Sequence, residues 1–170
     1  MPVEGSEFAA ALRQYAAGVV LMCVRDDIDD VGTTVTSAMS VSADPPLVAV
    51  ALTTDGYPHE VLESVGSCAL NVLGVQHEIL ASRFASAGRP SARHLLETVP
   101  WKRAEYSGGI VLDDAVTALD CRVAQLVPAG DHTLAVLEVV GVPVLEETRD
   151  PLLRLRGRWT DGAGRSFRRS

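Results

Sequence analysis

Short apolar runs separated by clusters of glycine, proline and acidic residues dominate the chain, and they predict strands more than helices. Residues 19–24 and 47–52 are apolar runs of strand length bounded by turn residues, which is typical of buried strands. Residues 119–124 alternate apolar and polar positions, the period of two of a half-buried strand. The same reasoning predicts further strands at residues 31–41, 68–73, 134–145 and 152–159.

Helical periodicity is confined to a few short segments. Phe8, Leu12 and Tyr15 lie at i, i+4 and i+7, which predicts an amphipathic helix at residues 6–16. Two more helices are predicted at residues 58–66, bracketed by a proline and a glycine, and at residues 76–85. Residues 86–110 are rich in glycine and proline and are expected to be mostly loop. The absence of a β-α-β rhythm favours an α+β fold, mainly β, with a barrel or strongly bent antiparallel sheet and short flanking helices.

Composition narrows the class of protein. The 170 residues suit one domain, expected over residues 1–160, followed by a basic tail at residues 161–170. A formal net charge of −7 disfavours nucleic-acid binding, and no apolar run reaches the roughly 18 residues that a membrane helix needs. The three cysteines form no metal or disulfide spacing, and the four histidines are scattered. We therefore expect a cytoplasmic protein with reduced thiols and no metal site.

A segment rich in hydroxyl groups precedes a proline corner. Residues 32–42 hold six Ser and Thr side chains, and Asp44-Pro45-Pro46 follows. Hydroxyl groups both donate and accept hydrogen bonds, so this ribbon suits a ligand with a polyol chain and a phosphate. A solvent-exposed edge strand rich in threonine explains the composition equally simply.

A polar turn is predicted between the last two long strands, at Gly130-Asp131-His132. The histidine can donate a hydrogen bond at a pocket mouth or pair with a phosphate. The turn can also be structural, with Asp131 capping the backbone and His132 merely exposed.

The order of these segments resembles the flavin reductase family with the FMN-binding split-barrel fold, the reductase partners of two-component flavin monooxygenases. The resemblance spans roughly residues 8–160. It rests on the following positions: Phe8 with Gly18-Val19-Val20; Gly32, Thr34, Ser37 and Ser40-Val41-Ser42; Asp44-Pro45-Pro46-Leu47; Asn71-Val72-Leu73 with Gln76 and Arg83-Phe84-Ala85; and Asp120-Cys121-Arg122, Gly130-Asp131-His132-Thr133 and Gly157-Arg158-Trp159.

The resemblance implies a six-stranded antiparallel Greek-key split barrel that forms a homodimer and holds FMN or FAD beside the dimer interface. It places His132 near the nicotinamide of NADH or NADPH, as the residue expected to act in catalysis. The cofactor-binding residues that it implies are Thr34, Val35, Thr36, Ser37, Ser40, Val41, Ser42, Arg83 and Phe84.

The expected function is NAD(P)H:flavin oxidoreductase, with hydride passing from nicotinamide to FMN or FAD and reduced flavin passing to a partner monooxygenase. Two alternatives remain open at this stage. One is an FMN-dependent oxidoreductase that acts on another small organic substrate, and the other is a non-catalytic module that binds flavin or haem.

Overall fold

The computed structural model describes residues 3–27 and 29–162. The predicted basic tail at residues 161–170 lies outside the described residues apart from its first two positions.

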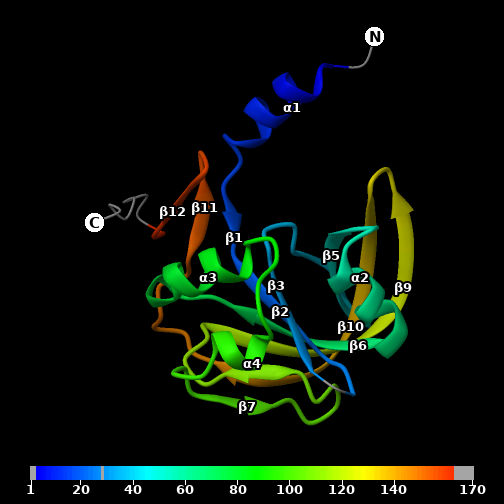
Figure 1. Ribbon diagram of the computed structural model, residues 1–170, viewed down its shortest axis with the longest axis vertical. Coiled ribbons are helices and arrows are strands. Elements are labelled where there is room, and N and C mark those ends of the chain that lie inside the picture. The colour runs from blue at the N-terminus through cyan, green and yellow to red at the C-terminus, as the bar shows by residue number, and fades with distance from the viewer. Residues whose placement is uncertain (1–2, 28, 163–170) are drawn as a thin grey trace.

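A seven-stranded antiparallel sheet forms the body of the protein (Figure 1). Its strand order is β3-β2-β6-β9-β10-β5-β4, so β3 and β4, which follow each other in the chain, lie at opposite edges. The strands are β2 (Val20–Arg25), β3 (Asp30–Val35), β4 (Met39–Ala43), β5 (Pro46–Thr53), β6 (Ser67–Val72), β9 (Thr117–Ala129) and β10 (His132–Leu145).

This architecture confirms a mainly β, antiparallel fold with few helices, but the pairing of the described strands differs from the expected six-stranded barrel. The single strand predicted at residues 31–41 is two strands, because the chain leaves one sheet edge after Val35 and enters the other at Met39. The described strands pair into one seven-stranded sheet whose hydrogen-bonded ladder does not close.

Two small sheets complete the strand content. Strand β1 (Ala17–Gly18) pairs with β11 (Leu153–Leu155), which pairs with β12 (Arg158–Thr160). The last predicted strand is therefore a hairpin, because Arg156 and Gly157 turn the chain with φ of 51° and 74°. The expected loop at residues 86–110 is wrong in part, since it holds the helix α4 (Ala92–Leu95) and β7 (Trp101–Arg103), which pairs with β8 (Ile110–Leu112).

The helices are short and lie at the margins of the sheet. Helix α2 (Tyr57–Val65) begins beside Pro58 and ends at Gly66, whose φ of 75° confirms the predicted glycine stop. The 3-10 turn η1 (Val75–His77) leads into α3 (Glu78–Phe84). Helix α1 (Gly5–Leu12) is shorter than predicted, buries none of its residues, and projects away from the rest of the chain (Figure 1). In the described part of the chain, no helix has the length and apolar character to cross a membrane.

The core lies on both faces of the sheet, which explains why residues 20–24 of β2 are all apolar and buried. Val20, Met22 and Val24 contribute to one buried cluster, whereas Leu21 and Cys23 contribute to a second cluster under α3, α4 and β8. Asn71 is one of several polar residues that are buried among the described part of the chain. Its amide nitrogen donates to the carbonyl oxygens of Leu21 and Ile110, and its side-chain oxygen accepts from the Leu112 amide at 2.8 Å. This side chain therefore ties β8 to the body of the sheet.

Candidate flavin-binding site

The hydroxyl-rich segment crosses between the two edges of the sheet and is pinned there by one serine. Ser37 Oγ donates to the carbonyl oxygen of Ala51 at 2.9 Å and accepts from the Ala51 amide at 3.0 Å. Strand β4 pairs with β5 only from Pro46 to Ala49, so the backbone of Ala51 has no strand partner on that side. Ser37 thus completes the edge of β5, and it holds the link between β3 and β4 against that strand.

The neighbouring hydroxyl groups divide into two sets. Thr34 Oγ1 donates to the Ala81 carbonyl oxygen at 2.9 Å and so joins β3 to α3. Thr36 and Ser40 are exposed, and their hydroxyl groups form no hydrogen bond to another described residue. These exposed hydroxyl groups are the ones that a ligand lying over the link can reach.

Three more of the sequence-predicted positions lie along the same stretch. Val35 is buried, at 6% exposure, and belongs to the core. Val41 is 47% exposed in β4, and Ser42 is half-buried. The predicted residues are therefore contiguous in the chain, but they do not share one face.

His132 begins β10, directly beside Thr53 of β5. Cross-strand neighbours share a face of the sheet, and so do residues two apart in a strand. His132 and Thr53 therefore lie on the same face as Ala51, and Ala51 and Thr53 are about 7 Å apart along β5. The structure thus brings the Ser37 link and His132 to neighbouring positions at one end of β5.

A carboxylate orients the histidine ring. Asp131 Oδ1 lies 2.7 Å from His132 Nδ1, and this hydrogen bond lowers the pKa of Asp131. Gly130, with φ of 70°, makes the tight turn from which both side chains extend. The Nε2 atom of His132 makes no hydrogen bond to a described residue, so it can donate to or accept from a ligand.

A cavity of about 190 Å³ lies between the ends of β3 and β5 and the start of α2. Thr33, Thr53 and His59 line it, and Arg89 lies at its edge. Arg89 Nε donates to the Gly32 carbonyl oxygen at 2.7 Å, and Nη1 donates to the Ser86 carbonyl oxygen at 3.1 Å. Burial lowers the pKa of Arg89, yet a guanidinium stays protonated at neutral pH. A fixed cation therefore lies beside the hydroxyl-rich strand.

Sequence reasoning selected Arg83 and Phe84 and missed Arg89. Arg83 is exposed in the last turn of α3. Phe84 is 1% exposed and packs on β3 at Gly32, so its part in a flavin site would be to hold that strand. The signal for Arg89 was its place between Gly88 and Pro90, where a fixed backbone directs a long cationic side chain.

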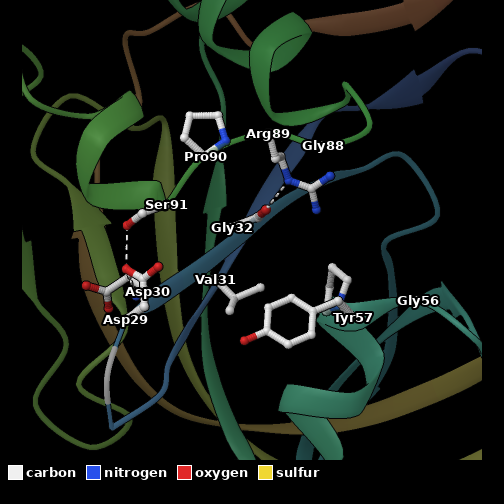
Figure 2. Close-up of a pocket in the computed structure, with 11 residues that line it drawn as sticks. Asp29, Asp30, Val31, Gly32, Gly56, Tyr57, Gly88, Arg89, Pro90 and Ser91 are labelled. Atoms are coloured by element: carbon white, nitrogen blue, oxygen red, sulfur yellow. Dashed lines mark hydrogen bonds between the residues drawn. The ribbon is translucent and has the colours of Figure 1, made fainter.

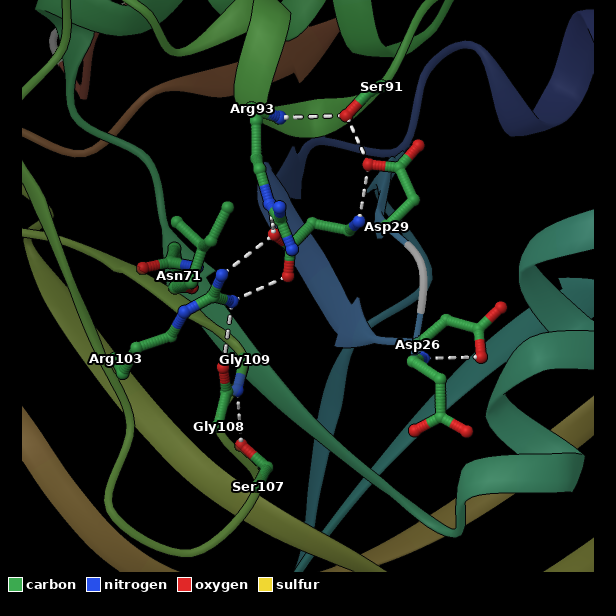
Figure 3. A network of polar contacts seen from close by, with 12 residues as sticks. Asp26, Asp29, Asn71, Ser91, Arg93, Arg103, Ser107, Gly108 and Gly109 are labelled. Carbon is green, nitrogen blue, oxygen red and sulfur yellow. Dashed lines mark hydrogen bonds and ion pairs between the residues drawn. The ribbon is translucent and has the colours of Figure 1, made fainter.

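A network of ion pairs fixes the start of β3 (Figure 3). Asp30, 1% exposed, accepts from Arg103 Nη1 and Nη2 at 2.5 and 2.9 Å and from Arg93 Nε at 2.5 Å. Burial would raise the pKa of Asp30, but the hydrogen bonds from Arg103 and Arg93 outweigh it and the pKa lies below its usual value. The network anchors α4, through Arg93, and β7, through Arg103, to the strand that carries the site.

This donor set fits a flavin nucleotide. Exposed hydroxyl groups suit a polyol, a fixed arginine suits a phosphate, and a polar sheet end beside a histidine suits the polar edge of a fused ring. Among the described residues, no group of three or more His, Cys, Asp or Glu side chains could hold a metal ion.

Residues 12–163 match the model of the flavin reductase like domain. The chain belongs to this family. The NADH-dependent FMN reductase of Streptomyces nodosus subsp. asukaensis is 35% identical over 155 residues, which cover 91% of this chain and 83% of that protein. The reductase component of the FADH2-dependent resorcinol hydroxylase of Rhizobium sp. is 33% identical, with 88% and 82% covered.

A solved structure gives the same assignment for this flavin reductase-like protein. The NADH:FAD oxidoreductase of Streptomyces globisporus superposes with a TM-score of 0.86 at 28% identity, and the match covers 99% of this chain and 96% of that chain. The resemblance drawn from the sequence is therefore confirmed at the level of the family.

Proposed function

We propose that this protein is an NADH-dependent flavin reductase that supplies reduced FMN or FAD to a partner monooxygenase. The observation that carries the proposal is the match of residues 12–163 to the flavin reductase like domain. Relatives described as NADH-dependent FMN and FAD reductases support the choice of substrates, and relatives described as reductase components support the oxygenase partner. A reductase that uses NADH would work in the cytoplasm.

The protein's own residues bind and orient the reactants. When bound, flavin supplies the redox chemistry, because its ring system accepts a hydride from reduced nicotinamide. Thr36 and Ser40 would hold the ring edge and the polyol, with Ser37 fixing the link that carries them. Arg89 would bind the phosphate, and Arg83 would add positive charge nearby. Such a reaction needs stacking geometry more than a strong acid or base, which agrees with a site without a catalytic dyad.

His132 would orient the nicotinamide. Its Nδ1 atom is held by Asp131, which leaves Nε2 for the nucleotide. A histidine fixed in this way presents one ring nitrogen in a defined direction.

The site also requires the two edges of the main sheet to lie close together, as in the split barrel that the family resemblance implies. Three residues, 36–38, connect β3 to β4, and Ser37 bonds to β5 across that connection. We extend the proposal to a homodimer, because apolar side chains remain exposed on α1, β4 and β10.

The test is steady-state oxidation of NADH by the purified protein with free FMN or FAD as acceptor. Turnover with flavin and NADH alone is expected. A protein that turns over only when an additional organic substrate is present would instead be a specialised flavoenzyme. A protein that binds flavin but never oxidises NADH would be a binding module.

A further inference from the structure

The turn that carries His132 is held from outside its hairpin by one threonine. Thr54 follows the last residue of β5, and its backbone N–H donates to the carbonyl oxygen of Asp131 at 3.1 Å. Its hydroxyl group lies 3.0 Å from the hydroxyl group of Thr133, so one of the two donates to the other. Thr54 therefore binds the residue before His132 and the residue after it.

The hydroxyl pair resists displacement of the turn. Thr133 is 4% exposed, and among the described residues its hydroxyl group has no partner other than Thr54. Movement of the turn away from β5 would leave this buried hydroxyl group without a hydrogen bond, which is unfavourable.

The same threonine begins the connection from β5 to α2. The amide of Gly56 donates to the carbonyl oxygen of Thr53 at 3.0 Å and so turns this connection. Figure 2 shows Gly56 and Tyr57 at the start of α2, where they line a cavity of about 430 Å³ that Arg89 also lines. The His132 turn is thus tied to the framework around the fixed arginine.

Asp131 determines which nitrogen of the neutral His132 ring carries the proton. Its Oδ1 atom lies 2.7 Å from Nδ1, and the hydrogen bond from His132 lowers the pKa of Asp131. The carboxyl group is therefore ionised at neutral pH, and a carboxylate can only accept a hydrogen bond. Nδ1 must then be the donor, so that in the neutral ring Nε2 carries a lone pair.

The contact between Asp131 and His132 would hold this geometry only weakly on its own. The Asp131 side chain is 92% exposed and the His132 side chain is 43% exposed. Exposed pairs of this kind contribute little by themselves. The two hydrogen bonds of Thr54 supply the missing rigidity, because they fix the chain on both sides of the histidine.

We propose that Thr54 and Asp131 are positioning residues that present His132 Nε2 as a hydrogen-bond acceptor, and that this acceptor selects a reductant through an amide N–H. The inference rests on the proposed function, in which His132 orients the nicotinamide. The carboxamide of nicotinamide carries such an N–H group. A hydrogen-bond donor at the same place would contact the carboxamide oxygen instead, and it would not distinguish an amide from a ketone.

Nitrogen-15 NMR of the ligand-free protein gives the tautomer directly. With the ring in its neutral form, we expect His132 to carry its proton on Nδ1. Asp131→Ala removes the acceptor and should shift the proton toward Nε2. A proton on Nε2 in the unmodified protein would overturn the proposal.

The kinetic arm compares NADH with its reduced 3-acetylpyridine analogue, in which a methyl group replaces the amide NH2. Thr54→Val and Asp131→Ala should raise the KM of NADH by about twofold to tenfold, the effect of one positioning hydrogen bond, and leave the KM of the analogue unchanged. Thr54→Ser keeps the hydroxyl group and should behave as the unmodified protein. Thr148→Val is the matched control, since it removes a hydroxyl group that donates to the exposed Glu146 beyond the other end of β10.

A purely structural role for Thr54 predicts a different pattern. Thr54→Val would then raise the KM of NADH and of the analogue by the same factor, together with a lower Tm and weaker flavin binding. That result would overturn the proposal.

The two proposals fail separately. Flavin reduction in which NADH and the analogue respond equally to the substitutions keeps the reductase function and rejects the acceptor role. A proton on Nδ1, in a protein that oxidises no NADH, rejects the reductase function and keeps His132 as an acceptor held by Thr54 and Asp131.

Discussion

Polar residues around the candidate site fall into those bound by the protein and those left for a ligand. Thr34 and Ser37 form hydrogen bonds that join separate elements of the fold. The hydroxyl groups of Thr36 and Ser40 form none within the described residues, and both side chains are exposed. Substitution of the first pair should therefore affect stability and binding together, whereas substitution of the second pair should affect binding alone.

His132 offers a test of nicotinamide binding. His132→Ala should raise the KM of NADH or slow flavin reduction by a few-fold to about tenfold, because one positioning hydrogen bond contributes about 0.5 to 1.5 kcal/mol. Flavin affinity should change little. Stopped-flow reduction of the flavin-loaded variant, with its Tm measured in parallel, gives the answer. Unchanged reduction at every NADH concentration would exclude His132 from the site, and a joint fall in Tm, flavin affinity and turnover would indicate a structural role.

Asp30 provides a pH-dependent contribution to stability. Its pKa is lower in the folded chain than in the unfolded chain, where a value of about 3.9 applies. Its stabilising effect is therefore complete above the unfolded pKa, and it is lost as the pH falls through the lower, folded pKa. Asp30→Asn leaves Arg93 and Arg103 without their buried partner, so we expect the free energy of unfolding at neutral pH to fall by about 3 to 5 kcal/mol.

Urea denaturation at neutral pH and near the unfolded pKa measures this effect. The difference between Asp30→Asn and the unmodified protein should shrink at the acidic end, since the carboxylate itself then becomes protonated. The exposed Asp27 is the control, and Asp27→Asn should leave stability unchanged at both pH values. A loss that is the same at all pH values would contradict an electrostatic origin.

Among the elements, β3 and α3 meet at an unusually close contact. A Cβ atom on Gly32 would lie 2.4 Å from Cε1 of Phe84, and Phe84 is fully enclosed. Glycine at this position lets the aromatic ring pack directly on the strand backbone. The same strand carries Thr33 and Thr34, so this packing positions the site.

Gly32→Ala should therefore destabilise the protein by about 1 to 3 kcal/mol, the usual effect of overpacking a core. Phe84→Leu removes the atoms that collide with the new methyl group, so the double variant should lose less stability than the sum of the two single variants. Thermal and urea unfolding of the four proteins measure the coupling. Strictly additive losses would show that the ring and the glycine do not constrain each other.

The elements that could be predicted are those with strong local signals. The apolar run at residues 19–24 and the proline and glycine around α2 gave correct assignments because burial and chain stops are encoded locally. The sequence did not predict that residues 31–41 divide into two strands, because Thr36 and Ser37 are residue types that suit a strand. The first strand ends at Val35 because β3 and β4 pair with different, distant strands at opposite edges of the sheet. Ser37 and His132, both selected from the sequence, lie beside the same strand β5. Arg89 reaches β3 from the loop between α3 and α4, and no periodicity in the sequence indicates that contact.

For the molecule as a whole, helix α1 is the helix that buries none of its residues in the described chain and leaves its apolar side chains exposed. Phe8 and Leu12 lie one turn apart on the helix and form an apolar face, yet they are 57% and 50% exposed. A helix of eight residues is not stable in water without a packing surface. A second copy of the chain, in the two-fold arrangement that is commonest among oligomers, would supply that surface.

Light scattering should therefore return about twice the chain mass of 18.0 kDa at micromolar concentration. The double substitution Phe8→Glu with Leu12→Glu places two charges on the apolar face, and burying them in an interface would be costly. It should shift the mass toward that of a single chain. Ala10→Glu adds a charge on the opposite side of the same helix, because position 10 is half a turn from position 8, and should leave the dimer intact. A single-chain mass for the unmodified protein would reject the dimer, while a dimer that survives the double substitution must form through β4 and β10, where Met39, Val41 and Val142 are exposed.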